Sequence, residues 1–468
     1  MPKQHLSTCS CSRRSFLHGC GLTLTGFGVA SLFPTPWIRH ALAGAPGNDR
    51  RLLFFFLRGG NDGLNAVIPH GDPAYSPALR PTLYVSPTQA LDLNGFASLH
   101  PALAPLMELY DAGQLAVVHR IGYPNSTKSH FDGSRIWENG DPSRPGLYEG
   151  WLYRYIHENA VSLGVELPAL SVQPTPPVIL QGAEKFVNIS SPDEFDYVMP
   201  DPKPAKFGGA WNGVARELVG LEPYRPVLSE TQVKLADMLD LYASWDQASW
   251  NPRDPDRGWS LFPVSQATNE PGFAPPAFSF FQALKVCALS LLESEGSSLN
   301  GTRIAGTQLS GFDHHTEQGA LVGQQPELLS WVAYGIRSLS IVLSGAASNE
   351  PRGYPSIWGK TVVATLSEFG RGTAENGSLG TDHGAASSIF LAGGPIHGGV
   401  YNCDAGSWPS GVMFGVEGRY LAMETDFRSV FWEVLRDHMG ASPAGADSVF
   451  PSYTALGLGA GELGLIQL

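Results

Sequence analysis

Residues 51–63 read RLLFFFLRGGNDG, an apolar run that ends in a glycine-rich turn. Because the apolar side chains follow one another without polar alternation, the run predicts a central strand over 51–57 that is buried on both faces. The glycines predict a tight turn directly after this strand. Asp62 lies in the turn. In an open parallel sheet, the edge where strands end is where ligands bind.

Further apolar runs predict more strands, and the stretches between them predict helices. The expected strands cover residues 115–121, 302–309, 361–366 and 388–392, and the expected helices cover 101–112, 231–245, 278–295, 328–343 and 427–439. The succession of strand, helix and strand over 51–121 predicts a parallel crossover unit. We therefore expect an α/β fold, in which the Pro-rich residues 163–300 form an insertion or cap.

The composition is typical of a large globular domain. The chain has 468 residues, of which 43% are hydrophobic and 16% are charged. This gives ample apolar material for a core and too few charges for a disordered or coiled-coil chain. The net charge of −13 predicts an acidic surface. Such a surface repels phosphate backbones and anionic lipids, which argues against nucleic acid and membrane-surface partners.

The N-terminal region has the pattern of an export signal. Residues 12–17 read SRRSFL and precede a mostly apolar run over 19–33, which is followed by ALA at 41–43. Paired arginines before a modest apolar run predict a twin-arginine signal over residues 1–43 and one mature domain over 44–468. A membrane anchor is disfavoured because the run is shorter than the roughly 20 residues that span a bilayer. We expect the twin-arginine translocase to export the chain to the periplasm or the cell exterior, without a stable membrane span.

Only two cysteines, Cys287 and Cys403, follow the predicted signal. In an oxidising compartment they are able to form one disulfide. Two buried thiols far apart in space are an equally good interpretation of the sequence.

Polar side chains that are able to bind metals or act as nucleophiles follow every predicted strand. In chain order they are Asp62, Ser129, Asp313 with His315, Glu368 with Arg371, Asp382 with His383, and His397. Singly, each also has a structural explanation, as a turn residue, a helix N-cap, a surface pair or a solvated ion pair. Together they predict one site at the edge of the sheet.

Several carboxylates and imidazoles at one sheet edge repel one another unless cations separate them. Mixed Asp and His ligand sets suit zinc, manganese or iron. Two such ions about 4 Å apart stabilise the attacking and leaving oxygens of an ester displacement. We therefore expect two divalent metal ions and a small anionic ester as substrate. In this scheme Ser129, at a helix start, is the nucleophile, and Arg58 or Arg371 holds non-bridging oxygens.

These residues resemble a bacterial family, exported by the twin-arginine route, that is catalogued as domain of unknown function fifteen-oh-one. The resemblance runs from the leader to about Gly440. It rests on the leader and on the motifs LRGGNDG at 57–63, SHF at 129–131, GFDHH at 311–315, SEFGR at 367–371 and TDHG at 381–384.

That family is placed in the alkaline phosphatase and sulfatase superfamily, so the resemblance implies a mixed, mostly parallel sheet between helix layers. By chain order it implies the following roles: Asp62 as the first metal-binding aspartate, Ser129 as nucleophile, Asp313 with His315 and Asp382 with His383 as ligand pairs, and His397 as the last ligand. A loop separates Glu368 from Thr381, which leaves open whether Glu368 or Asp382 takes the metal position. The Cys-x-Pro-x-Arg signature of formylglycine sulfatases is absent, which disfavours that type of sulfatase.

Two hypotheses of different class follow from the sequence. The first is an exported metal-dependent hydrolase of phosphate or sulfate esters with a serine nucleophile. The alternative is a non-catalytic exported binding or surface-assembly protein that retains the fold, which the displaced Asp-His-Gly motif favours. A purely structural metal is disfavoured because structural sites are closed and often rich in cysteine.

Overall fold

The computed structural model describes residues 49–163, 168–182, 186–189, 249–263, 275–293, 302–350 and 352–467. The predicted signal at 1–43, the expected helix at 231–245 and most of the Pro-rich segment 163–300 lie outside the described residues.

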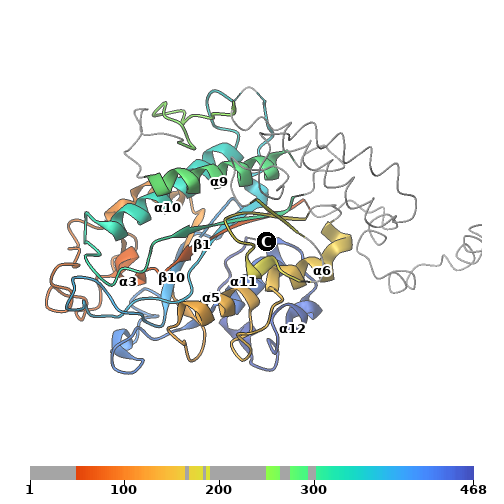
Figure 1. Ribbon diagram of the computed structural model, residues 1–468. Coiled ribbons are helices and arrows are strands. Elements are labelled where there is room, and N and C mark those ends of the chain that lie inside the picture. Colours follow the sequence, from red (N-terminus) through yellow and green to blue (C-terminus); the bar gives the residue numbers. More distant parts are fainter. Residues whose placement is uncertain are drawn as a thin grey trace, which may run out of the picture.

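A mixed sheet runs through the centre of the molecule (Figure 1). Among the described residues its strand order is β11-β5-β10-β9-β1-β8-β6-β7, and β12 pairs with β5. Both neighbours of β1, which are β8 and β9, run parallel to it. The strands are β1 (Arg51–Arg58), β5 (Leu115–Gly122), β6 (Ala169–Val172), β7 (Val187–Ile189), β8 (Ile304–Ser310), β9 (Thr361–Leu366), β10 (Ser387–Ala392), β11 (Gly399–Tyr401) and β12 (Thr425–Asp426).

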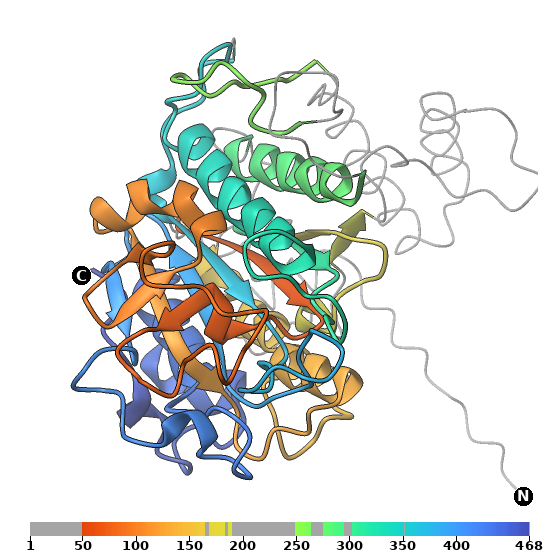
Figure 2. The ribbon, with the colours of Figure 1, turned by 90° about the vertical axis from the view of Figure 1, so that its left-hand side faces the viewer.

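Helices cover both faces of the sheet, and the side chains of β1 alternate between them. The odd-numbered side chains from Leu53 to Leu57 pack in the same apolar cluster as α9 (Pro275–Leu292) and α10 (Gln324–Leu343). These two helices run side by side, as Figure 2 shows. The even-numbered side chains from Leu52 to Phe56 pack on the opposite face. The helices of that face are α5 (His130–Asn139), α6 (Trp151–Leu163), α11 (Phe427–Glu433) and α12 (Ala446–Val449).

Short elements complete the described fold. A small antiparallel sheet pairs its strands in the order β2-β4-β3, and short helices flank it. These elements are β2 (Val67–Pro69), β3 (Leu91–Asp92), β4 (Ala97–Leu99), α3 (Gly63–Ala66) and α4 (Met107–Asp111).

The predicted fold class, a mixed and mostly parallel sheet between helix layers, is confirmed. All five expected strands form within two residues of the expected ends. β5 runs parallel to β1, as the expected crossover requires, but it is not a neighbour of β1. Both β9 and β10 lie between them, and β10 is antiparallel to β5 and to β9. The carboxyl end of β10 therefore lies at the opposite edge of the sheet from those of β1, β8 and β9.

Both cysteines beyond the predicted signal are buried free thiols. Cys287 lies on α9 and Cys403 follows β11, and neither forms a disulfide. Among the described residues, no helix combines the length and the apolar character that a membrane crossing requires.

Candidate functional site

The loops that follow β1, β8 and β9 meet at the carboxyl edge of the sheet, where Arg371 joins them. Its guanidinium donates from Nε to Gly60 O at 2.7 Å, from Nη1 to Thr381 O at 3.1 Å and from Nη2 to Phe312 O at 2.9 Å. The side chain is buried. Arginine carries five N–H donors in a rigid fork, so one residue is able to hold three loops at a constant spacing.

The glycine pair after β1 allows these loops to approach closely. Gly59 has φ +116° and Gly60 has φ +72°, conformations that residues with a side chain rarely adopt. A Cβ at Gly59 would lie 2.5 Å from the backbone nitrogen of Asp313, and one at Gly60 would lie 2.5 Å from the ring of Phe369. The turn predicted from the sequence therefore brings the segment after β8 and the segment after β9 against β1.

Asp313 is the centre of the site. One carboxylate oxygen, Oδ1, lies 2.6 Å from Arg371 Nη2, 3.0 Å from His315 Nε2, 3.2 Å from His383 Nε2 and 3.3 Å from His130 Nε2. Partial burial alone would raise the pKa of Asp313, but the hydrogen bond and charge of Arg371, with the neighbouring histidines, lower it to about 2. Asp313 is therefore ionised at neutral pH, and its side chain is still 46% exposed.

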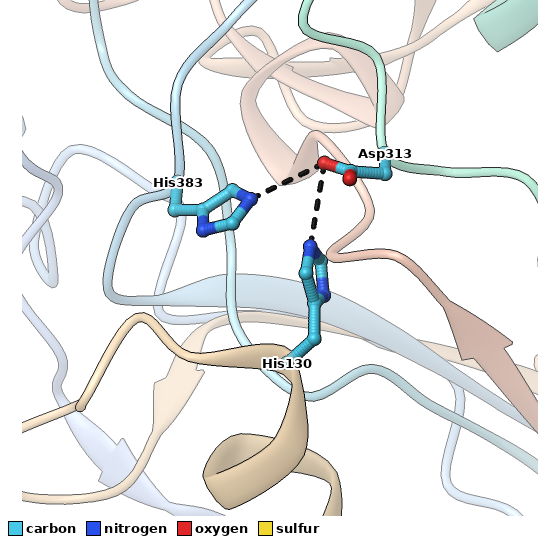
Figure 3. A group of neighbouring side chains, drawn as sticks. All are labelled: His130, Asp313 and His383. Carbon is cyan, nitrogen blue, oxygen red and sulfur yellow. Dashed lines mark hydrogen bonds and ion pairs between the residues drawn. The ribbon is translucent and has the colours of Figure 1, made fainter.

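His130 and His383 both turn their Nε2 atoms towards Asp313 (Figure 3). The Nδ1 of His383 lies 2.8 Å from the carbonyl oxygen of Lys128, and the Nδ1 of His130 lies 2.9 Å from Glu368 Oε1. Because a carbonyl or carboxylate oxygen only accepts hydrogen bonds, each Nδ1 carries the proton and donates. In the neutral imidazoles, each Nε2 then presents a lone pair to Asp313. Nδ1 donation to an oxygen acceptor is the usual way in which proteins orient metal-binding histidines.

Three of these side chains are close enough together to hold a metal ion. The ligand atoms of His130, Asp313 and His383 all lie within 4.8 Å of one another. The hydrogen bond and charge of Glu368, with the charge of Asp313, raise the pKa of His130, whereas burial lowers the pKa of His383. Nε2 of His130 is buried and has no partner other than Asp313 Oδ1, at 3.3 Å. A proton or a metal ion at this point would relieve the repulsion between two lone pairs and a carboxylate.

His315 and Asp382 lie at the rim of this group. Nε2 of His315 is 2.9 Å from Nε2 of His383, and its Nδ1 is 3.7 Å from Asp382 Oδ1. Asp382 also accepts a hydrogen bond from Asn376 at 3.1 Å and lies 3.6 Å from Arg419. Half of the Asp382 side chain is exposed. Of the expected ligands, Asp313, His315 and His383 therefore come together, and Asp382 borders them.

Glu368, Arg58 and Ser129 occupy supporting positions. Glu368 is buried and accepts from the backbone N–H of Gly59 at 2.8 Å as well as from His130. Arg58 pairs with Glu138 at 2.6 Å rather than with any residue of the site. Ser129 is the N-cap of α5, and its hydroxyl accepts from the backbone of Asp132 over a long 3.4 Å.

The structure separates Asp62 and His397 from the other expected ligands. Asp62 is 1% exposed and forms an ion pair with Arg80 at 2.6 Å. His397 follows β10 at the opposite edge of the sheet, where its Nδ1 lies 3.2 Å from the carbonyl oxygen of Gly464. The antiparallel direction of β10 explains this placement.

His130 is the site residue that the sequence analysis did not assign. It stands in the SHF motif directly after Ser129, as the first residue of α5. The signal in the sequence is its position next to Ser129. The sequence analysis assigns a function to the serine and none to the histidine. Arg80, which pairs with Asp62, has no recognisable motif around it.

A family model matches the segment of the chain that carries several of these residues. No curated protein and no solved structure matches the chain. Residues 297–410 carry Asp313, Glu368, Arg371 and His383, and this segment matches the family described as protein of unknown function (DUF1501).

Proposed function

We propose that this chain is a metal-dependent hydrolase of phosphate or sulfate esters, with a metal site formed by His130, Asp313 and His383. One observation carries the proposal: two imidazoles, each with its Nδ1 held by an oxygen acceptor, direct Nε2 at the same carboxylate oxygen. A divalent cation satisfies all three groups at once.

The donor set fits zinc or manganese. Two imidazoles and one carboxylate are borderline ligands, which suit these ions better than calcium or magnesium. Apart from Asp313 Oδ1 at 3.3 Å, the buried Nε2 of His130 has no partner, so its lone pair is available to a metal ion. Three protein ligands with a half-exposed Asp313 leave a position open to solvent, a pattern typical of catalytic zinc sites.

A bound metal ion would act as a Lewis acid on an anionic ester. The protein supplies the nucleophile and its placement. Ser129 lies between Lys128, whose carbonyl orients His383, and His130. The helix dipole of α5 favours negative charge at this serine. In the proposed reaction Ser129 Oγ loses its proton to solvent and bonds to phosphorus or sulfur. The alcohol leaves with a proton, and water then cleaves the serine ester.

The two expected arginines have different roles in this proposal. The guanidinium of Arg371 is buried and donates to backbone carbonyls and to Asp313, so it positions that ligand instead of binding substrate. Arg58 is 21% exposed and, although paired with Glu138, is the better candidate for contact with an anion.

The proposal extends to the compartment and the fold family. The paired arginines and apolar run of residues 12–33 support export by the twin-arginine translocase to the periplasm or cell exterior. The mixed sheet, with Asp62 after β1 and the site at the carboxyl edge, supports an alkaline-phosphatase-like fold.

A non-catalytic binding protein is the second candidate, and the ion pair of Asp62 favours it. Asp62 stands where the superfamily resemblance implies a metal ligand, and Arg80 already neutralises it. A chain that had lost part of a catalytic site would show such a change.

Metal content and turnover, measured on the same preparations, separate the two candidates. Wild-type protein, purified without chelators, is analysed by plasma mass spectrometry and assayed with aryl phosphate and aryl sulfate esters. We expect Asp313→Asn to lose both metal and turnover, and Ser129→Ala to keep metal but lose turnover. His397→Ala, an exposed histidine at the other edge, is the matched control and should keep both. Metal binding without turnover in the wild type would favour the binding protein, and turnover in Ser129→Ala would remove the serine from the mechanism.

A further inference from the structure

Asp62 and Arg80 form a fully buried ion pair next to the proposed metal site. Arg80 is 0% exposed. Its Nη1 lies 2.6 Å from Asp62 Oδ2, and its Nη2 lies 3.2 Å from Asp62 Oδ1, so the two groups meet in a bidentate arrangement. Gln318 donates a further hydrogen bond to Asp62 Oδ2 at 2.7 Å. Both oxygens of this carboxylate are therefore taken by N–H donors.

The guanidinium of Arg80 has no donor left for any other ligand. Besides Asp62, it donates to the carbonyls of Thr373 at 2.8 Å and Gly372 at 2.9 Å and to Asn65 Oδ1 at 2.8 Å. These bonds use all five N–H groups of the side chain. The two carbonyls belong to the segment that leads from Arg371 to His383. Arg80 thus binds Asp62 and the segment of the site at the same time.

A second divalent ion at Asp62 would meet an existing cation. Burial alone would raise the pKa of Asp62, but the charge of Arg80 and the hydrogen bonds from Arg80 and Gln318 lower it. The carboxylate is therefore ionised and paired. Guanidinium and carboxylate in a dry, bidentate pair balance each other's charge. A metal ion would have to displace Arg80 and leave its charge buried without a partner, which is strongly unfavourable.

We propose that Arg80 permanently occupies the place of a second cation, and that this chain binds one divalent metal ion, at His130, Asp313 and His383. This inference rests on the proposed function, because it assumes that His130, Asp313 and His383 hold a metal ion. It replaces the two-ion site expected from the sequence. Asp62 becomes a positioning residue, which acts on the site through Arg80 and the segment that follows Arg371.

The test is the number of zinc ions bound per chain, measured by plasma mass spectrometry and by calorimetric titration of the chelator-treated full chain. We expect one ion in the wild type and none in Asp313→Asn. The double variant Asp62→Asn/Arg80→Met removes both charges, so it avoids an unpaired buried arginine. It should still bind one ion, with a Kd within about tenfold of the wild type. Asp62→Asn alone gives the same stoichiometry if it folds.

Two ions in the wild type, with one lost in the double variant, would overturn the inference. Zero ions in the wild type would overturn both this inference and the proposed function. Ester turnover distinguishes the two in the remaining cases. One ion without turnover supports the single-ion inference and contradicts the hydrolase. Two ions with turnover contradict the single-ion inference and support the hydrolase.

Discussion

The carboxylate of Glu368, which accepts a hydrogen bond from His130 Nδ1, allows a direct test of the proposed metal site. Glu368 is 2% exposed, and its Oε1 receives the Nδ1 proton of His130 at 2.9 Å and the N–H of Gly59 at 2.8 Å. In Glu368→Gln the amide oxygen is able to accept both bonds in place of Oε1, while the negative charge is lost. Without that charge the Nε2 of His130 is a weaker base and a weaker ligand.

The expected effect follows from the role of such outer carboxylates. Their loss typically weakens metal affinity about 10-fold to 100-fold. This corresponds to about 1.4 to 2.7 kcal/mol of binding free energy. The affinity for zinc is measured at pH 7 by competition with a chromophoric chelator of known affinity, on wild type and variant.

A matched control separates this effect from a general loss of charge. Glu375 belongs to the loop between Arg371 and His383, but its carboxylate binds Thr82 and the backbone N–H of Leu83. Glu375→Gln should leave zinc affinity within about twofold, since it touches no proposed ligand. Equal affinities in wild type and Glu368→Gln would refute the reasoning, as would an equal loss in the control.

Three further predictions concern stability and accessibility. Burial lowers the pKa of His119 to about 4, and its Nδ1 accepts the N–H of the next residue. Because the unfolded histidine binds a proton near pH 6.5, stability is full above that pH and falls by about 3 kcal/mol as the pH drops to 4. Urea unfolding of His119→Gln should show a smaller fall over that range, and an unchanged fall would contradict this. Gly60→Ala should cost about 1 to 3 kcal/mol in the same assay, because its Cβ would meet the ring of Phe369 at 2.5 Å, and a cost below about 0.5 kcal/mol would count against the close approach. Burial raises the pKa of both Cys287 and Cys403, so we expect neither to react with a thiol reagent until the chain unfolds, and rapid labelling of native protein would show otherwise.

Local patterns predicted the strands well, because each central strand carries a run of apolar residues that only a buried sheet position accommodates. The strand order was not predictable in this way. β10 is as apolar as β9, and neither run contains information on direction, so the antiparallel placement of β10 was missed. That one strand decides where His397 lies.

The candidate site was predicted in part for the same reason. Asp313 and His383 were identified because both follow parallel strands whose ends meet at one edge. His130 was missed because it begins a helix beside a more conspicuous serine. Asp62 was placed with the ligands since the sequence gives no sign of Arg80, whose pairing depends on a loop folding back over the end of β1.

The strand order also bears on how the chain is made. β1 has the most apolar run of the sheet, yet both of its neighbours, β8 and β9, come late in the chain. At the usual rate of synthesis of about 5 to 20 residues per second, the roughly 250 residues between β1 and β8 take on the order of 10 to 50 s to emerge. During that time the apolar run of β1 has neither of its partner strands. The fold therefore leaves residues 51–58 exposed to aggregation until both β8 and β9 have been synthesised.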